Sequence, residues 1–288
     1  MKRKFLLASV VAAFVLFSRP PVQACTLWGA AGDAVAGGGS LIVKNRDWKP
    51  DHRQQLRVVK PEKGYAYLAL TMVDRTLSGI AKGGINEKGF AVVNATASTI
   101  PAAKRNHLPA TSRLNEKLLS QCASVDEALA KIDLFVGPRH LMLADKQKIA
   151  VVEIGPEGET SVRVQENGVL YHTNHYLDET LLYANARPNA SSEARYKRIA
   201  ELLAQARRPY TLDTFIGFSQ DRHAGPDNSI FRIGSKPSGT RTVAVIAFSI
   251  PPSGSPEAYV RILNPGEKEK VYRLAVQDLL DGKIRLDS

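Results

Sequence analysis

Cysteine is scarce in this chain, with two residues among 288. Two cysteines cannot form the dense disulfide framework of a small secreted scaffold, and a chain of this length can bury a large core without one. Long apolar runs are also missing, since no stretch reaches the roughly 18 uninterrupted apolar residues that a transmembrane helix requires. The chain has no run of five Lys or Arg residues and no internal repeat, so neither a basic nucleic-acid-binding tail nor a solenoid is indicated.

The composition is that of a globular protein. Hydrophobic residues make up 44% of the chain and charged residues 23%, and it contains 21 Gly and 16 Pro. These proportions exclude collagen-like, coiled-coil and wholly disordered chains. No linker-like segment divides the sequence, which indicates one domain.

The N-terminal segment has the features of a secretory signal peptide. Three basic residues at 2–4 precede an apolar run over 5–17, which is too short to span a bilayer. Val22 and Ala24 are small residues at the positions that favour cleavage between Ala24 and Cys25. We therefore predict a signal peptide over residues 1–24, a single domain over 25–288, and a secreted or periplasmic mature protein that begins with Cys25.

Basic residues exceed acidic ones even after this cleavage. Loss of Lys2, Arg3, Lys4 and Arg19 lowers the formal net charge from +11 to +7. The remaining Lys and Arg residues are scattered, which is typical of a solvated surface and disfavours nucleic-acid binding. The basic excess also favours a substrate that carries a carboxylate.

The two cysteines allow several interpretations. In an exported protein Cys25 and Cys122 could form a disulfide, although apolar residues at helical spacing around Cys122 indicate a buried core thiol. Residues 22–25 also approximate a bacterial lipoprotein processing site, in which Cys25 would carry a lipid anchor. Residues 25–30 are apolar and strand-like rather than a polar tether, so a lipid-anchored binding protein is the second choice.

Strand patterns dominate the mature chain. Alternating or apolar runs predict strands over residues 41–44, 55–60, 65–73, 78–85, 90–97, 140–143, 149–154, 161–165, 169–173, 230–233, 242–250, 259–263 and 270–274. Hairpin turns are predicted at 86–89 and at Asn167-Gly168, and the glycines at 37–39 are read as a turn rather than a phosphate loop.

Helical patterns occupy the middle of the chain. They predict helices over 112–122, from a capping box at Ser124 to about residue 132, over 192–206 and over 211–218. Strands at both ends with helices between them predict an antiparallel α+β fold of two stacked sheets with helices on their outer faces.

An N-terminal cysteine can carry its own catalytic base. The thiolate is the nucleophile, and an α-amino group with a pKa of roughly 7.7 to 8.0 can accept the thiol proton near neutral pH. Attack on an amide creates an oxyanion, which neutral donors such as Asn side chains can stabilise by about 3 to 4 kcal/mol each. Cys25 would thus supply both nucleophile and base.

Four segments in order carry a family resemblance. They are Cys25-Thr26, residues 45–48 (Asn-Arg-Asp-Trp), residues 84–94 with Asn-Glu-Lys-Gly, and residues 172–176 (His-Thr-Asn-His-Tyr). The chain resembles the N-terminal nucleophile hydrolases of the penicillin V acylase, bile-salt hydrolase and isopenicillin-N acyltransferase group. The resemblance implies a four-layer αββα sandwich with 25–288 as its catalytic domain.

The resemblance also assigns roles to individual residues. It implies that Cys25 is the nucleophile, that Asp47 orients the N-terminal amine and that Asn174 is a side-chain oxyanion donor. Asn94 falls where bile-salt hydrolases have a second polar site residue.

Two arginines compete for the remaining polar role. Arg195 resembles the position in the bile-salt hydrolase branch and Arg232 the position in the acyltransferase branch, and the sequence leaves this choice open. The chain departs from the bile-salt hydrolases at Lys44, where that branch carries an Arg three residues before the Asp.

Each of these residues also has an ordinary structural interpretation. Asp47 alone is typical of a turn or cap, Asn94 of a strand bulge, and Asn174 of the start of a loop. Arg195 on a helix is most often solvated, and an ion pair of Arg232 is equally common. Their joint order after Cys25 favours the catalytic interpretation.

No cofactor or metal is predicted. His172 and His175, with Asp178 nearby, lack the i, i+4 spacing that places two ligands on one helical face, and no cysteine pair completes a set. The partner implied is a small-molecule amide, with a monomer and an oligomer equally compatible with the sequence. The predicted function is that of a cysteine amidohydrolase acting through a thioester on Cys25, with acyl transfer to an amine as a close variant.

Overall fold

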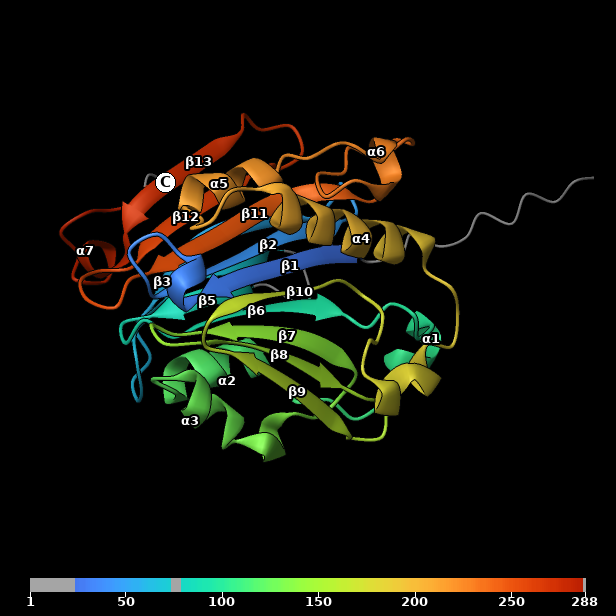
Figure 1. The fold of residues 1–288 in the computed structure, drawn as a ribbon, viewed down its shortest axis with the longest axis horizontal. Helices are drawn as coiled ribbons and strands as arrows, with labels where there is room; N and C mark the ends of the chain where they lie inside the picture. The colour runs from blue at the N-terminus through green and yellow to red at the C-terminus, as the bar shows by residue number, and fades with distance from the viewer. Residues whose placement is uncertain (1–23, 74–78, 287–288) are drawn as a thin grey trace, which may run out of the picture.

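The computed structural model describes residues 24–73 and 79–286, which form two stacked β-sheets with helices on their outer faces (Figure 1). The predicted antiparallel α+β sandwich is confirmed. Residues 1–23, which make up nearly all of the predicted signal peptide, lie outside the described residues.

The first sheet has six antiparallel strands in the order β10-β1-β2-β11-β12-β13. Its strands are β1 (Ala24–Ala31), β2 (Ser40–Trp48), β10 (Gly168–His172), β11 (Arg241–Ile250), β12 (Glu257–Ile262) and β13 (Lys270–Ala275). Strand β1 is buried along its whole length, because it pairs with β10 on one side and β2 on the other while the second sheet and a helix cover its faces.

The second sheet has seven antiparallel strands in chain order. They are β3 (Arg53–Val59), β4 (Tyr67–Val73), β5 (Ile80–Asn86), β6 (Ala91–Thr96), β7 (Arg139–Ala144), β8 (Ile149–Ile154) and β9 (Thr160–Gln165). The predicted hairpin turn at 86–89 is present between β5 and β6, with Gly89 at φ +78°, a conformation that L-residues rarely adopt. The hairpin predicted at Asn167-Gly168 is wrong. A turn is present there, with Gly168 at φ +137°, but β9 pairs with β8 and β10 pairs with β1, so the turn carries the chain from one sheet to the other.

Helices cover each sheet from outside. Helices α4 (Ala190–Gln205) and α5 (Leu212–Phe218) lie over the six-stranded sheet, and α2 (Leu114–Gln121) and α3 (Val125–Leu129) lie against the seven-stranded sheet (Figure 1). The short helices are α1 (Ala102–Arg105), α6 (Gly225–Asn228), α7 (Val276–Leu280) and the 3-10 segments η1 (Gly32–Ala34), η2 (Ile132–Leu134) and η3 (Glu179–Ala184).

Three apolar layers hold these four layers together. Side chains from both sheets, such as Leu27 and Met142, meet in the central layer. Trp28 on the opposite face of β1 packs with Ile199 and Phe215 of the upper helices. Because successive side chains of a strand point to opposite faces, β1 contributes to two layers at once.

One predicted strand is wrong and another is too short. Residues 230–233 form a loop, in which Asn45 Nδ2 donates to the Ile230 carbonyl at 2.9 Å and the Phe231 N–H donates to the Asp221 carbonyl at 2.8 Å. The strand predicted over 41–44 extends to Trp48, so Asp47 lies within a sheet rather than in a turn. Ser78, the predicted start of the strand over 78–85, lies outside the described residues.

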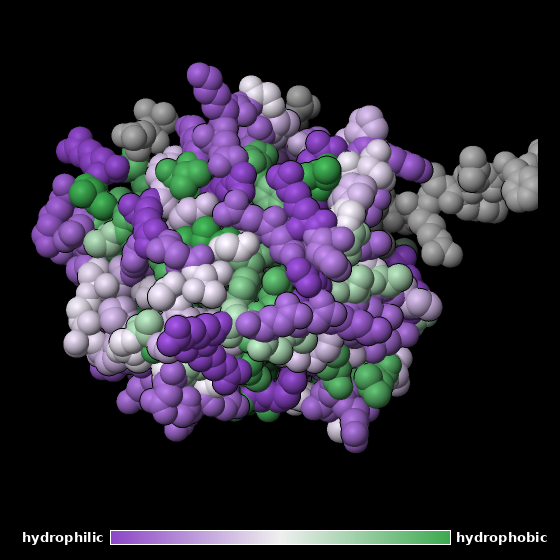
Figure 2. Space-filling view, turned by 45° about the horizontal axis from the view of Figure 1, so that its top comes forward, coloured by the Kyte–Doolittle hydropathy of each residue, from purple (hydrophilic) through white to green (hydrophobic). Residues whose placement is uncertain are grey.

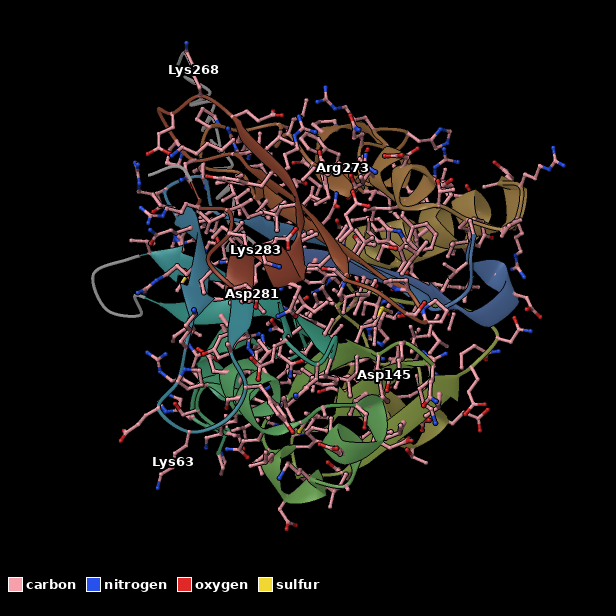
Figure 3. All side chains as sticks on the ribbon, turned by 90° about the vertical axis from the view of Figure 1, so that its left-hand side faces the viewer. Lys63, Asp145, Lys268, Arg273, Asp281 and Lys283 are labelled. Atoms are coloured by element: carbon pink, nitrogen blue, oxygen red, sulfur yellow. The ribbon has the colours of Figure 1, made fainter. Side chains whose placement is uncertain are left out.

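Hydrophilic residues cover most of the face that Figure 2 shows. Hydrophobic residues show only as patches among hydrophilic ones in Figure 2, and Lys63 and Lys268 extend from opposite ends of the molecule in Figure 3. Lys283 and Asp281, which lie together in that view, form an ion pair at 3.2 Å. No helix among the described residues is both long and apolar enough to cross a membrane.

Candidate active site

Cys25 lies near the start of β1, at the centre of the predicted site. Ala24 and Cys25 stand opposite Asp47 and Arg46 of β2 in the sheet register. On the other side of β1, Leu27 stands opposite His172, the last residue of β10. The register therefore brings Asp47 and the segment after His172 beside Cys25, although they are far apart in sequence.

Asn174 contacts the backbone of Cys25 directly. The Cys25 N–H donates to Asn174 Oδ1 at 2.8 Å, and Asn174 Nδ2 donates to the Thr96 carbonyl at 2.9 Å. Asn174 is fully buried. These bonds orient the amide with its oxygen toward the backbone nitrogen that would become the N-terminal amine.

Arg195 approaches the same atoms from helix α4. Its Nη1 donates to the Cys25 carbonyl at 2.5 Å and to Thr26 Oγ1 at 2.9 Å, and its Nη2 donates to Asn174 Oδ1 at 2.9 Å. Arg195 is 0% exposed, so the expectation that a helical Arg is solvated is wrong here. Burial lowers the pKa of Arg195 to about 10, and Asp47 opposes this change.

Asp47 is buried on the other side of Cys25. Its Oδ1 accepts a hydrogen bond from Thr242 Oγ1 at 2.8 Å, and its Oδ2 lies 3.9 Å from Arg232 Nη1 without a hydrogen-bond partner among the described residues. Burial raises the pKa of Asp47, whereas Arg232 and Arg195 act to lower it. The Asp47 carboxylate is thus a buried acceptor with one oxygen unused.

Both arginines therefore lie at the site, in different places. Arg195 contacts Cys25 and Asn174, and Arg232 faces Asp47. The loop over 230–233 holds Arg232 there, because its N–H donates to Thr242 Oγ1 at 2.9 Å and its carbonyl accepts the Thr242 N–H at 2.9 Å.

Asn94 lies on strand β6 of the other sheet and is held by two donors. Its Oδ1 accepts from Asn115 Nδ2 of α2 at 3.0 Å and from Lys44 Nζ at 3.3 Å. Its pairing with Leu141 is regular, so the bulge interpretation is not supported. Fixing the oxygen leaves the Asn94 NH₂ group as the polar group available to a ligand.

A cavity of about 430 Å³ adjoins these residues. Its lining includes Cys25, Asn94 and Thr96 together with five cationic side chains, Lys44, Arg46, Lys82, Arg105 and Arg139, and no acidic side chain among the described residues. Burial lowers the pKa of Lys44 to about 7 and that of Arg46 to about 10, with opposing contributions from Cys25. The cavity is therefore a positively charged recess next to a thiol.

Comparison with known proteins gives the family. The family model of acyl-coenzyme A:6-aminopenicillanic acid acyl-transferase matches residues 35–257. The chain belongs to this family. The matched part of this acyl-transferase family member contains Asp47, Asn94, Asn174, Arg195 and Arg232, while Cys25 precedes it.

Two solved structures share the fold. The chain is similar to penicillin V acylase from Agrobacterium tumefaciens at 15% identity, with a TM-score of 0.52 and coverage of 89% of this chain and 87% of that chain. It is also similar to a mutant of conjugated bile acid hydrolase from Clostridium perfringens at 13% identity, with a TM-score of 0.55 and coverage of 90% and 94%. No curated protein sequence matches it significantly.

Both solved proteins are N-terminal nucleophile hydrolases with this fold. The family match places the chain in the acyl-transferase family, and its fold is the one that these two N-terminal nucleophile hydrolases share. The family resemblance carried by the sequence motifs is thus confirmed.

Some residues at the site have no clear signal in the sequence of this acyl-transferase family member. Thr242 is the second residue of an ordinary strand, and Asn115 lies on an ordinary amphipathic helix. Lys44 does carry a signal, since a lysine after the apolar run Leu41-Ile42-Val43 is unusual in a fully buried strand.

His172, His175 and Asp178, which were considered as metal ligands from the sequence, do not form a ligand group among the described residues. His175 Nδ1 lies 2.8 Å from Ser192 Oγ, and Asp178 Oδ1 accepts from the Thr180 N–H at 3.0 Å. Within the described residues, one other group, His140, Glu153 and His172, brings potential ligand atoms within 4.8 Å of one another.

Proposed function

We propose that this protein is an exported cysteine amidohydrolase that cleaves the amide bond of a small N-acylated compound through a thioester on Cys25. The supporting observation is the hydrogen bond from the Cys25 N–H to the buried Asn174 side chain, next to a cavity lined by Cys25 itself. The proposal requires removal of residues 1–24, so that this nitrogen becomes a free amine.

The geometry supports a simple proton path. The α-amine takes the thiol proton, the sulfur attacks the amide carbon, and the same proton passes to the leaving nitrogen as the C–N bond breaks. Water then attacks the thioester, the C–S bond breaks, and the thiol is restored with release of the acid. Asn174 Oδ1 would orient the amine, and the unused Asp47 Oδ2, beside the register position of Ala24, offers a second acceptor.

Two asparagines are candidates for stabilising the oxyanion. Asn174 uses its Nδ2 for one bond to the Thr96 carbonyl, which leaves a second amide hydrogen. Asn94 has its oxygen held by Lys44 and Asn115, which leaves its NH₂ group for a ligand. We propose Asn174 as the oxyanion donor and Asn94 as a substrate-binding residue.

The charge of the cavity supports an anionic substrate. Five cationic side chains line it and no acidic side chain among the described residues does so. Lys44 and Arg46 are buried, and burial of a cation is unfavourable, so a bound anion would help to stabilise these two side chains. We therefore propose a substrate whose acyl or amine part carries a carboxylate.

There are two alternatives. A lipid-anchored protein fits the structure less well, and an acyltransferase differs only in the molecule that accepts the acyl group. A lipid on Cys25 would have to leave a side chain that is 4% exposed in a strand paired on both sides, which argues against a lipid-anchored protein. Acyl transfer follows the same first step, with an amine rather than water resolving the thioester. The matched acyl-transferase family supports keeping this second candidate.

Removal of the leader has a structural constraint. Ala24 is 1% exposed within β1, so a peptidase could not reach the bond before Cys25 once the sheet has formed. We propose that cleavage precedes closure of the sheet, as signal peptidase cleavage during export to the periplasm or medium would.

The test combines mass spectrometry with a substrate panel. We expect the exported protein to have the intact mass of residues 25–288, and to hydrolyse N-acyl amides with a carboxylate better than matched carboxamides. A form that retains one extra residue before Cys25 should lose turnover, because its nitrogen is no longer an amine. A diacylglycerol mass on Cys25, or full turnover by the extended form, would refute the proposal.

A further inference from the structure

A buried hydrogen-bonded pair lies behind the Asn174 segment. His172 Nε2 lies 2.5 Å from Glu153 Oε1, and the exposed fractions of the two side chains are 0% and 2%. Glu153 belongs to β8 of the seven-stranded sheet and His172 ends β10 of the six-stranded sheet. The pair therefore joins the two sheets next to the candidate site.

Glu153 also holds the far side of the same segment. Its carboxylate accepts the Leu177 N–H at 2.9 Å and the Asp178 N–H at 3.0 Å. Burial acts to raise the pKa of Glu153, but the bonds from His172 and these backbone groups lower it overall. One carboxylate thus binds residues 172, 177 and 178, on both sides of Asn174.

The His172 ring is fixed from several directions. Its Nδ1 lies 3.1 Å from the Thr173 carbonyl, so both ring nitrogens have a polar partner. The His140 ring packs against it with centroids 4.3 Å apart. Burial, followed by the neighbouring His172 and His175, lowers the pKa of His140 well below its usual range, so His140 is neutral.

The backbone of Asn174 is tied down within this frame. Its N–H donates to Ser192 Oγ at 2.9 Å, and its carbonyl accepts the Ser98 N–H at 3.1 Å. A shift of the segment by about 1 Å would move the Asn174 amide off the reacting carbonyl, and errors of this size can cost about 100-fold in rate.

We propose that Glu153 and His172 are positioning residues, which clamp residues 172–178 between the two sheets and so aim the Asn174 side chain at Cys25. This role rests on the proposed function, in which Asn174 serves the nucleophile and the oxyanion. Neither side chain lines the cavity, so both act through Asn174 rather than on the substrate.

The same cluster could be read as a metal site, but its hydrogen bonds oppose this. Both oxygens of Glu153 already accept bonds from His172 or from backbone N–H groups. A metal would have to displace the His172 bond to gain ligands. The geometry therefore favours a hydrogen-bonded clamp.

The test uses the exported protein, residues 25–288, with Glu153→Gln and His172→Gln, and with Glu166→Gln as a control that removes a carboxylate from an exposed position. We expect kcat to fall about 10- to 100-fold in the first two variants, with KM changed by less than about 3-fold. Alkylation of Cys25 by iodoacetamide needs no oxyanion donor and depends on Asn174 only through the amine that it orients, so its rate should fall by a smaller factor than kcat. The control should match the wild-type protein in all three.

Further variants keep the test decisive if Glu153→Gln does not fold. His172→Gln keeps an N–H donor for Glu153, so it should retain more activity than His172→Leu. A wild-type kcat in Glu153→Gln, or equal losses in turnover and in alkylation rate, would overturn the positioning role. It would also be overturned if the wild-type protein bound one equivalent of zinc and His172→Gln did not. Absence of amide turnover in the wild-type protein would instead refute the proposed function itself.

Discussion

The two cysteines are both buried free thiols, yet their surroundings differ in kind. Cys25 lies beside a cavity lined by five cationic side chains. Cys122, at the end of α2, packs among apolar side chains between that helix and the seven-stranded sheet, and burial raises its pKa to about 11. Burial alone therefore does not distinguish the two thiols, whereas the adjoining cavity and its cationic lining do.

Each cysteine also has a buried asparagine against its backbone. Asn86 Nδ2 donates to the carbonyls of Leu119 and Cys122, at 2.8 and 2.7 Å, so both of its amide hydrogens are used. Asn174 Nδ2 donates to one protein carbonyl among the described residues. Both amide hydrogens of Asn86, beside Cys122, are used in structural hydrogen bonds, whereas Asn174, beside Cys25, has one amide hydrogen left for a ligand.

The largest expected effect comes from replacing each thiol, which tests whether Cys25 and Cys122 differ in function. We expect Cys25→Ser to lower kcat/KM by at least about 10³-fold, because a hydroxyl is a far weaker nucleophile without a strong base. Cys122→Ser should keep kcat/KM but lose about 1 to 3 kcal/mol of unfolding free energy, since its hydroxyl would be buried among apolar groups. Steady-state kinetics and urea unfolding measure the two effects, and equal activity losses would show that the regions do not differ.

A second test replaces the two asparagines. Asn174→Ala should lower kcat by about 10²- to 10³-fold, as expected for an oxyanion donor. Asn86→Ala should leave kcat near the wild-type value and destabilise the protein by about 2 to 3 kcal/mol, because two buried carbonyls lose their donor. A lower kcat for Asn86→Ala in folded protein would contradict the division of roles.

The smallest effect is a difference in how stability depends on pH. The pKa of Lys44 falls from 10.5 to about 7 on burial, so above about pH 7 the unfolded chain binds the proton that the folded chain has released, and stability rises with pH. Between about pH 7 and 9 we expect this gain to be on the order of 2 kcal/mol, and to disappear in Lys44→Met.

Cys122 should act in the opposite direction. Its pKa is raised from 9.0 to about 11, so between these values the unfolded chain loses the proton that the folded chain keeps, and stability falls as pH rises. Thermal unfolding of the wild-type protein, Lys44→Met and Cys122→Ala between about pH 7 and 11 would separate the contribution of Lys44 from that of Cys122. A pH dependence in Lys44→Met identical to that of the wild-type protein would contradict the assignment to Lys44.

Much of the fold could be predicted from local patterns. Alternation marked strands such as residues 149–154, whose bounds match β8, and the Asn167-Gly168 pair marked the turn before β10. The error at 230–233 has a physical reason. Ile230 and Phe231 are buried as the pattern required, but a side chain and a bend near Asp221 satisfy their backbone groups instead of a neighbouring strand.

The candidate site could be predicted as a set of residue types but not as a geometry. The motif order singled out Cys25, Asp47 and Asn174, and the sheet register places all three together. It could not choose between Arg195 and Arg232, because a helical arginine and a loop arginine show nothing in sequence of the buried groups they will meet. His172 stood out in the motif over 172–176, but nothing in the sequence indicated that Glu153 of another strand would pair with it.

The sequence by itself determined most of the segments that become strands, where the chain turns between them and which thiol stands at the predicted cleavage site, because these depend on neighbours a few residues apart. Only the tertiary structure decided that Arg195 reaches the Cys25 carbonyl across 170 positions of sequence and that Cys25 borders a cationic cavity. Such contacts arise only when two sheets and a helix pack together. Burial then shifts the pKa values of groups around Cys25 and Cys122 whose local sequence gives no sign of it.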